Sequence, residues 1–205
     1  MNISLDVLKK YGACDPGIEC FKYLKTTTVH ETINKCMSLS DDVVLRWTND
    51  VLDKYKWCSW LLSRILPKDE KIKYAIYSAR LVIDIFEKKY PNDNRPRKAI
   101  EAAELYLEGK VTKEQIGDAV DAAAYAAADA ANAANAAYTA AYAAANAANA
   151  AYTAAYDAAN AAVYAAAAAY TAANAANAAA ADRKEIFKSI ITYGLTLIEE
   201  SEVVK

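Results

Sequence analysis

Apolar side chains recur every three or four residues along much of the chain, which is the spacing of one face of an α-helix. The clearest example is the segment from residue 68 to 89, which we expect to be one amphipathic helix. Its apolar positions are Ile72, Ala75, Ile76, Ala79, Val82, Ile83 and Phe86. No segment shows the strict alternation that predicts a half-buried strand. The pattern therefore predicts an all-α protein, built as a multi-helix bundle.

Proline and glycine divide the remaining apolar pattern into further helices. Pro16 and Pro96 fall at first helical positions, where the missing N–H is tolerated. Pro67 and Gly109 are expected to end helices, and Gly194 is expected to bend the last one. The expected helices cover residues 3–11, 15–25, 28–37, 40–55, 57–66 and 96–109, with a final helix over about 186–197.

The stretch from Asp118 to Ala181 is mostly alanine and contains no Gly, Pro, Lys or Arg. The sequence NAANAAYTAAY begins at Asn132 and again at Asn146, so the stretch repeats every 14 residues. Alanine is the best helix former, which predicts helix throughout. About 64 residues in one straight helix would extend roughly 95 Å, whereas a compact chain of this length has a radius of gyration of about 17 Å. We expect either a folded-back helix pair or a long rod that pairs with a second copy as a homodimer.

The larger residues of this stretch form one stripe, because they recur at steps of three and four. The opposite face carries almost only methyl groups, so we expect close contact between helices there. The stripe could bind a partner, or it could pack against the N-terminal helices or a second protomer. The candidate binding residues are Tyr142, Asn146, Asn149 and Tyr156 on the stripe, with Tyr138 and Tyr152 just beside it.

Composition divides the chain into three expected regions. Residues 1–111 form an N-terminal helical region, and residues 112–182 form the alanine-rich repeat helix, introduced by a capping box of Thr112 and Gln115. Residues 183–205 are expected to form a C-terminal helix that packs on the N-terminal region.

Two other functions of an alanine-rich helix are less favoured. A membrane span is disfavoured because Asn, Thr and Asp recur every few residues, and polar groups are costly in hydrocarbon. An ice-binding or structural rod would need threonines on a regular spacing, but Thr139, Thr153 and Thr171 do not follow an 11-residue spacing.

Charge makes nucleic acid an unexpected partner. The net charge is −2. Residues 1–116 hold 20 Lys and Arg against 17 Asp and Glu, and the remainder holds 4 against 9, so neither part is basic enough to neutralise phosphates. The N-terminus has no apolar leader, so a cytoplasmic protein is expected.

Residues for catalysis or cofactor binding are sparse. The four cysteines form no CxxC pair and His30 is the only histidine, so we expect buried reduced thiols and neither a metal nor another cofactor. No nucleophile and base have a recognisable spacing, so no enzyme is expected. The charged group of Asp93, Arg95, Arg97 and Glu101 could bind a charged ligand, or it could fix its loop through ion pairs with Arg80.

Several segments together resemble one known family. These are YGACDPGIECF (Tyr11–Phe21), KWCSWLL (Lys56–Leu62), the segment Tyr74–Gly109 and the Ala/Tyr/Asn-rich stretch that follows. In this order they are similar to the Imm-5-like immunity proteins, which occur in bacteria and in phage and prophage genomes. The chain departs from the family pattern at Cys20, where an aromatic residue is usual, and between Tyr74 and Ser78, which lacks the usual cysteine.

The resemblance implies a non-enzymatic intracellular protein that binds and inhibits a toxin or effector protein. An alternative is a phage-encoded counter-defence protein, which would bind a host immune component or sequester its signal molecule. The family supplies no catalytic residues that could be transferred to this chain.

Overall fold

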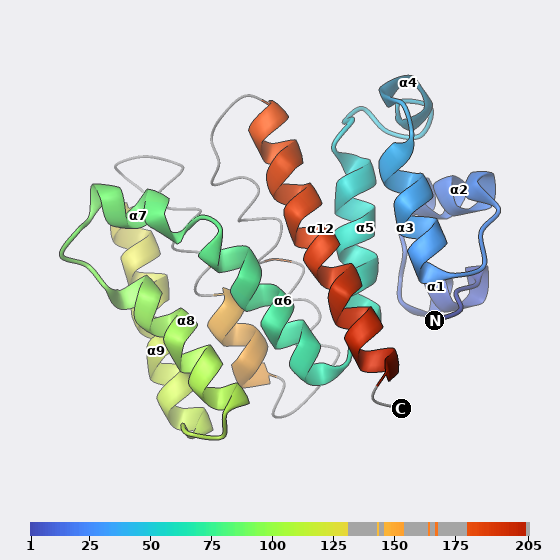
Figure 1. Ribbon diagram of the computed structural model, residues 1–205. Coiled ribbons are helices and arrows are strands. Elements are labelled where there is room, and N and C mark those ends of the chain that lie inside the picture. The colour runs from blue at the N-terminus through green and yellow to red at the C-terminus, as the bar shows by residue number, and fades with distance from the viewer. Residues whose placement is uncertain (131–142, 144–145, 154–163, 165–166, 168–179, 204–205) are drawn as a thin grey trace.

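The computed structural model describes residues 1–130, 143, 146–153, 164, 167 and 180–203. These residues contain ten named helices and no strand, so the predicted all-α fold is confirmed. Figure 1 shows their arrangement. The helices are α1 (Leu5–Lys10), α2 (Asp15–Leu24), α3 (Val29–Ser38), α4 (Asp41–Val44), α5 (Asp53–Ile65), α6 (Lys68–Arg80), α7 (Ile83–Lys89), α8 (Arg95–Leu107), α9 (Lys113–Ala130) and α12 (Ala180–Val203).

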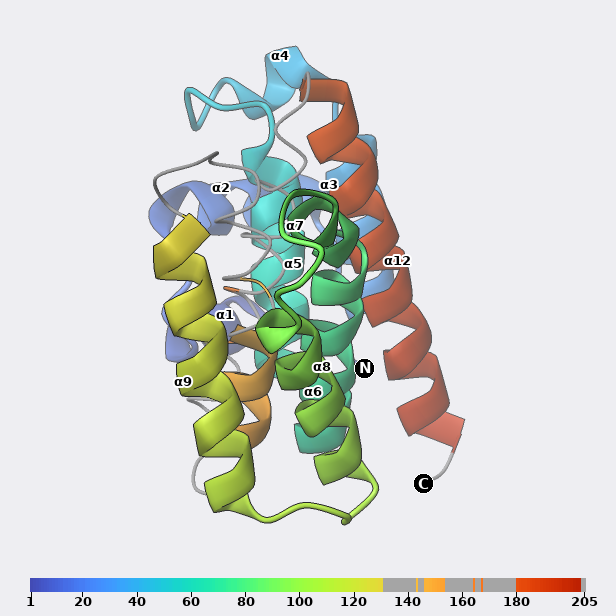
Figure 2. The ribbon, with the colours of Figure 1, turned by 90° about the vertical axis from the view of Figure 1, so that its left-hand side faces the viewer.

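The C-terminal helix α12 packs against both α5 and α6 (Figure 1). On one side of this centre α3 contacts α5, and α2 contacts both α1 and α3. On the other side α6 contacts α8, which forms a hairpin with α9. Figure 2 shows α5, α6, α8 and α9 running roughly side by side. The division into three regions made from composition stays a prediction.

Local capping residues begin several helices where the sequence suggests. The Ser4 side chain accepts a hydrogen bond from the Val7 N–H at α1, and Thr28 caps α3 in the same way. The capping box before α9 is present: Thr112 N–H donates to Gln115 Oε1 at 2.8 Å, and Gln115 N–H donates to Thr112 Oγ1 at 3.4 Å.

The predicted helix over residues 40–55 is wrong, because α4 covers only Asp41–Val44 and α5 begins at Asp53. Side chains in between bond to nearby backbone. Asp50 Oδ1 accepts from the Leu52 N–H at 2.9 Å, and Thr48 Oγ1 accepts from the Asp50 N–H at 3.4 Å. Such local bonds offer the backbone an alternative to the helix.

The single helix predicted over residues 68–89 is also divided. It breaks at Val82, whose φ of −129° is not helical, and continues as α7 in a new direction. Val82 itself is fully buried, as are Ile83 and Phe86 of α7. The apolar spacing thus identifies the buried positions correctly. The change of helix axis at Val82 lets α7 keep its apolar side chains in the core.

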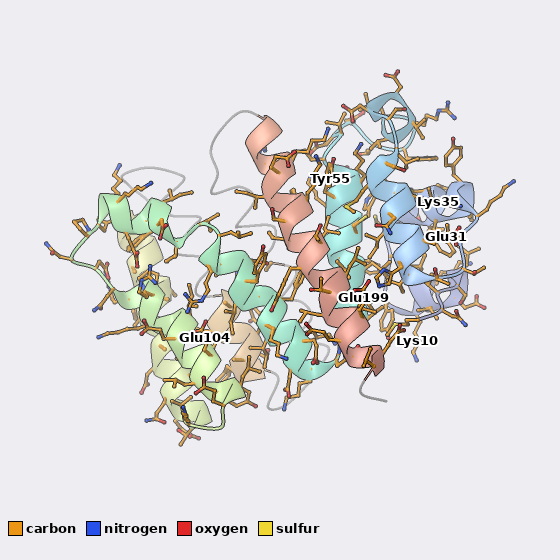
Figure 3. All side chains as sticks on the ribbon, viewed as in Figure 1. Lys10, Glu31, Lys35, Tyr55, Glu104 and Glu199 are labelled. Carbon is orange, nitrogen blue, oxygen red and sulfur yellow. The ribbon has the colours of Figure 1, made fainter. Side chains whose placement is uncertain are left out.

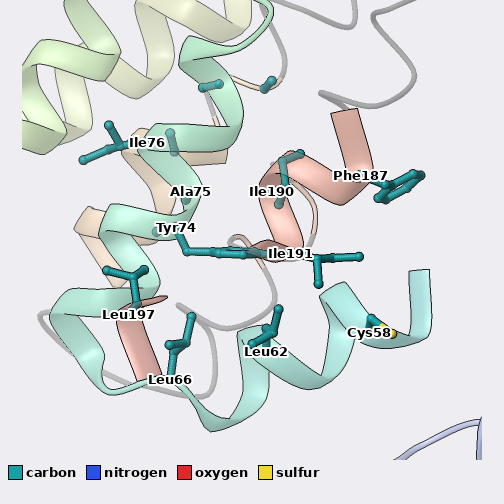
Figure 4. Close-up of a cluster of buried hydrophobic side chains, with 14 of the residues drawn as sticks. Cys58, Leu62, Leu66, Tyr74, Ala75, Ile76, Phe187, Ile190, Ile191 and Leu197 are labelled. Carbon is teal, nitrogen blue, oxygen red and sulfur yellow. The ribbon is translucent and has the colours of Figure 1, made fainter. Parts of the chain in front are cut away.

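The core between α5, α6 and α12 is organised around Tyr74 (Figure 4). The Tyr74 side chain reaches from α6 towards Ile191 of α12, above Leu62 of α5. It is fully buried, and its hydroxyl bonds to the Ser59 hydroxyl at 2.8 Å. This bond satisfies the polar atom that the ring carries into the core.

Gly194 is a point of close approach in α12. A Cβ placed there would lie 2.8 Å from both Leu62 Cδ1 and Tyr74 Cε2. The predicted bend stays a prediction, because a continuous helix from Ala180 to Val203 can be either straight or curved. The absence of a side chain lets α12 lie directly against α5 and α6.

The alanine-rich stretch is not one straight rod. A Cβ on Gly117 of α9 would lie 3.6 Å from Cε2 of Tyr152, although one straight helix would separate these residues by roughly 50 Å. These two residues therefore cannot lie on one straight helix, which agrees with the folded-back alternative. Figures 1 and 2 show the helical residues 146–153 near α9.

Candidate functional site

The charged residues singled out in the sequence lie where α6, α7 and α8 meet. Asp93 lies in the loop before α8 and pairs with Arg95 through two bonds, of 2.9 Å to Nε and 2.7 Å to Nη2. Asp93 Oδ1 also accepts from the Arg95 backbone N–H at 3.1 Å. These bonds favour the ionised carboxylate, so Arg95 holds the pKa of Asp93 below its usual value.

Arg97 joins α8 to α7. Its guanidinium bonds to both carboxylate oxygens of Glu87, with 2.6 Å from Nη2 to Oε2, and lies 3.7 Å from Asp84. The hydrogen bond from Arg97 holds the pKa of Glu87 below its usual value. The two-pronged geometry fixes the angle between the helices as well as adding attraction.

Arg80 joins α6 to α8 in the same manner. Its Nε and Nη2 each bond to a Glu104 carboxylate oxygen at 2.7 Å, and Figure 3 labels Glu104 on α8. The sequence-based alternative expected Arg80 to form ion pairs with the charged group around Asp93. The structure pairs Arg80 with Glu104. Asp93 is held by Arg95 instead.

We call these three ion pairs together the arginine face: Arg80, Arg95 and Arg97 with their partners Glu104, Asp93 and Glu87. Arg80 and Arg97 lie close enough to interact electrostatically, whereas the pair of Asp93 and Arg95 lies at the start of α8. The three arginine side chains are 36–45% exposed. Each bond orders a long side chain without burying it, so the face remains open to a partner.

The candidate residues of the stripe have mixed positions. Asn146 is 8% exposed, and Asn149 and Tyr152 are half-buried. Neighbouring alanines at 147, 148, 150 and 151 are fully buried, so this segment packs closely through its methyl groups. Tyr138, Tyr142 and Tyr156 lie outside the described residues.

His30 connects α3 to the C-terminal helix. Its Nδ1 lies 3.8 Å from Glu199 Oε1, and its Nε2 is buried with no hydrogen-bond partner in the described structure. Figure 3 labels Glu199 on α12. The described part of the chain contains no group of three or more His, Cys, Asp or Glu side chains positioned to hold a metal ion.

Sequence reasoning missed a cavity of about 280 Å³ bordered by α1, α2, α3 and α5. All four cysteines line it, although they span residues 14–58 without a recognisable spacing. Its existence depends on how α2 and α3 meet α5, which no local pattern reveals. The lining residues are Leu8, Gly12, Ala13, Cys14, Gly17, Cys20, Phe21, Leu24, Thr32, Ile33, Cys36, Lys56, Trp57, Cys58, Trp60 and Leu61.

The thiols at the cavity are free, and three of them are buried. The Sγ atoms of Cys20 and Cys36 are 3.8 Å apart. Contact with Cys36 and burial raise the pKa of Cys20. For Cys36, the contact with Cys20 lowers the pKa, but the contact with Cys58 and burial outweigh it and the pKa is raised. Both groups are therefore neutral thiols.

Comparison with known proteins adds one match. No curated protein and no solved structure matches the chain, and none of the described helices is both long and apolar enough to span a membrane. A family model described as Imm-5-like putative immunity protein matches residues 62–192. This segment contains the arginine face, α6 to α9 and most of α12. Because the match covers more than half of the chain, the protein belongs to the Imm-5-like family of putative immunity proteins.

Proposed function

We propose that the protein is a non-enzymatic immunity protein that inhibits a toxin or effector protein by binding to it. The observation that carries this proposal is the family match over residues 62–192. Direct binding is the simplest mechanism for a helical protein whose charged groups are engaged in ion pairs with one another.

We assign the contact to the arginine face. A function common to the family should rest on matched residues, and all of Arg80, Asp93, Arg95 and Arg97 lie within them. Arginine is enriched at protein interfaces. The existing bonds hold the guanidinium groups in place, so binding would lose little side-chain entropy. The stripe residues Asn149 and Tyr152 offer less surface, because they are half-buried.

Co-expression with candidate toxins tests the proposal. The chain should restore growth of cells that produce the toxin and should bind the purified toxin in calorimetry. Replacing Arg95 and Arg97 by Gln should weaken both effects at least tenfold. The matched control replaces Lys9 and Lys10 by Gln, which are exposed on α1 outside the matched segment, and should change neither.

The outcomes separate the function from the location of the contact. Failure of the unchanged protein both to restore growth and to bind would contradict the immunity function. Full activity of the variant with Arg95 and Arg97 replaced would move the contact away from the arginine face, whatever its melting midpoint. A host immune protein bound in place of the toxin would favour the counter-defence alternative.

A further inference from the structure

The cavity bordered by α1, α2, α3 and α5 lies almost entirely outside the segment that matches the family. Its volume of about 280 Å³ is near the lower end of the ~300–1,000 Å³ typical of ligand pockets. Protein interiors are otherwise closely packed, and an unfilled cavity lowers stability. The cavity is therefore large enough to hold a small ligand.

The lining of the cavity is apolar and aromatic. Phe21, Trp57 and Trp60 contribute rings, and leucine and isoleucine side chains cover much of the remainder. The lining includes Cys20 and Cys36, which are at most 4% exposed. Burial raises the pKa of both thiols, so they are neutral. Such a lining favours apolar ligands.

The two polar side chains of the lining are engaged elsewhere. The Thr32 hydroxyl donates to the Thr28 carbonyl at 2.7 Å and lies 2.6 Å from the Thr26 hydroxyl. Lys56 Nζ bonds to carboxylate oxygens of Asp50 and Asp53, each at 2.7 Å. The cavity thus offers no uncompensated positive charge to an anion, and burying an unpaired charge there would be costly.

We propose that this cavity is a binding site for a small, neutral, apolar molecule with an aromatic ring. The rings of Trp57 and Trp60 would pack against it, and the neutral thiols would contact it as polarisable apolar groups. A phosphorylated or otherwise charged signal molecule does not fit this chemistry. The inference does not depend on the proposed toxin, and its test needs no toxin.

The entrance lies beside the start of α2. Gly12 and Cys14 are the exposed residues of the lining, so the cavity meets solvent there. Gly17 lies close to Cys14 and Trp57: a Cβ there would lie 3.4 Å from Cys14 Sγ and 3.7 Å from the Trp57 ring. A larger side chain at position 17 would therefore extend among the lining residues and narrow the cavity.

The test uses the neutral fluorescent probe N-phenyl-1-naphthylamine with the full-length protein. Two of the three tryptophans line the cavity, so binding should quench their emission through energy transfer and enhance the emission of the probe. Gly17→Leu should weaken binding at least tenfold. The matched control Glu19→Leu places the same side chain on an exposed position of α2 and should bind like the unchanged protein. Adenosine triphosphate should not displace the probe.

A covalent block provides a second measurement on a natively folded chain. Benzyl methanethiosulfonate should modify the exposed Cys14: its thiol loses a proton, sulfur bonds to the benzylthio group, and methanesulfinic acid leaves. The attached ring should occupy the cavity and abolish probe binding, and dithiothreitol should restore it. The Cys14→Ser variant should be insensitive to the reagent.

Two results would overturn the proposal. The first is that the unchanged protein fails to bind the probe up to its solubility limit. The second is that binding persists unchanged both in Gly17→Leu and after benzylation of Cys14, which would place the probe elsewhere on the surface.

Discussion

Among the five glycines, Gly194 leaves the least space for a side chain. The two groups nearest to a Cβ there are parts of Leu62 and Tyr74, both fully buried, so neither can move into solvent. We expect Gly194→Ala to lower the free energy of unfolding by about 1–3 kcal/mol, the usual effect of overpacking a core. Urea unfolding followed by circular dichroism measures this.

Gly117 is the matched control because it is also a helical glycine at a contact between helices. A Cβ there would lie 3.6–3.9 Å from the Tyr152 ring, which is ordinary van der Waals contact. Gly117→Ala should therefore keep the packing and raise stability by up to about 1 kcal/mol through helix propensity. Equal effects of the two substitutions would show that propensity, and not close approach, determines the role of Gly194.

The pair of Glu87 and Arg97 should make stability depend on pH. The hydrogen bond from Arg97 lowers the pKa of Glu87 from its ordinary value of 4.5. A lowered pKa contributes stability that is present above the ordinary value and is lost as pH falls through the lower, folded-state value. The difference in melting midpoint between the protein and Glu87→Gln should thus be largest above about pH 5.5 and shrink below about pH 4.5.

Arg97→Gln provides an independent comparison, because it removes the cation and leaves the carboxylate. Like Glu87→Gln, this variant should lack the fall in stability that the unchanged protein shows as pH drops through the folded-state pKa of Glu87. A difference from the unchanged protein that stayed constant between pH 3 and pH 7 would contradict the link to Glu87.

These residues show what sequence can reveal at this scale. The capping roles of Ser4 and Thr28 follow from neighbours within three positions, so they are predictable. The role of Gly194 depends on Leu62 and Tyr74, far away in the sequence, and no local pattern distinguishes it from a bend. The same limit applies to the partners of Arg80, because Asp93 and Glu104 are equally plausible until α8 is placed.

At the scale of elements, apolar periodicity predicts helix and buried face well but predicts continuity poorly. Val82, Ile83 and Phe86 are buried as their spacing indicates, yet the chain changes direction between α6 and α7. The signal for the break before α5 was present in Thr48 and Asp50, whose side chains compete for backbone hydrogen bonds.

The helix α9 allows a direct test of the alanine face. Ala123 is fully buried and the next residue, Ala124, is exposed. Ala123→Leu should destabilise by about 1–3 kcal/mol, because the added atoms have no space between closely packed helices. Ala124→Leu should change stability by less than about 0.5 kcal/mol. Thermal melts of both variants give the comparison, and equal midpoints would mean that α9 does not pack through its methyl face.

At the scale of the whole molecule, the features that matter most join distant segments. The cavity combines residues from α1, α2, α3 and α5, and Gly117 lies close to Tyr152, 35 positions further along the chain. Composition predicts that a helix of this length must fold back or find a partner, but it does not say where it packs. The sequence therefore predicts the fold class, whereas the sites depend on tertiary structure.

The family segment should not fold without the N-terminal residues. It begins at Leu62, inside α5, but α12 packs along α5, where Tyr55 stacks on Phe187 with centroids 6.2 Å apart. Figure 3 labels Tyr55 on α5. Removing residues 1–61 would expose the apolar face of α12, including Phe187 and Ile190, both at most 2% exposed. We expect residues 62–205 to show no cooperative thermal transition by circular dichroism.

A shorter deletion separates the contribution of α5 from that of the helices around the cavity. Removing residues 1–40 takes away α1, α2 and α3 but keeps all of α5 against α12. This variant should still unfold cooperatively, with a lower midpoint because α3 no longer covers α5. Tyr55 and Phe187 remain stacked in this variant. Tyr74 also keeps its neighbours Leu62 and Ile191. A cooperative transition in both truncated chains would mean that α6 holds α12 without most of α5, and the arginine face could then be studied on the family segment alone.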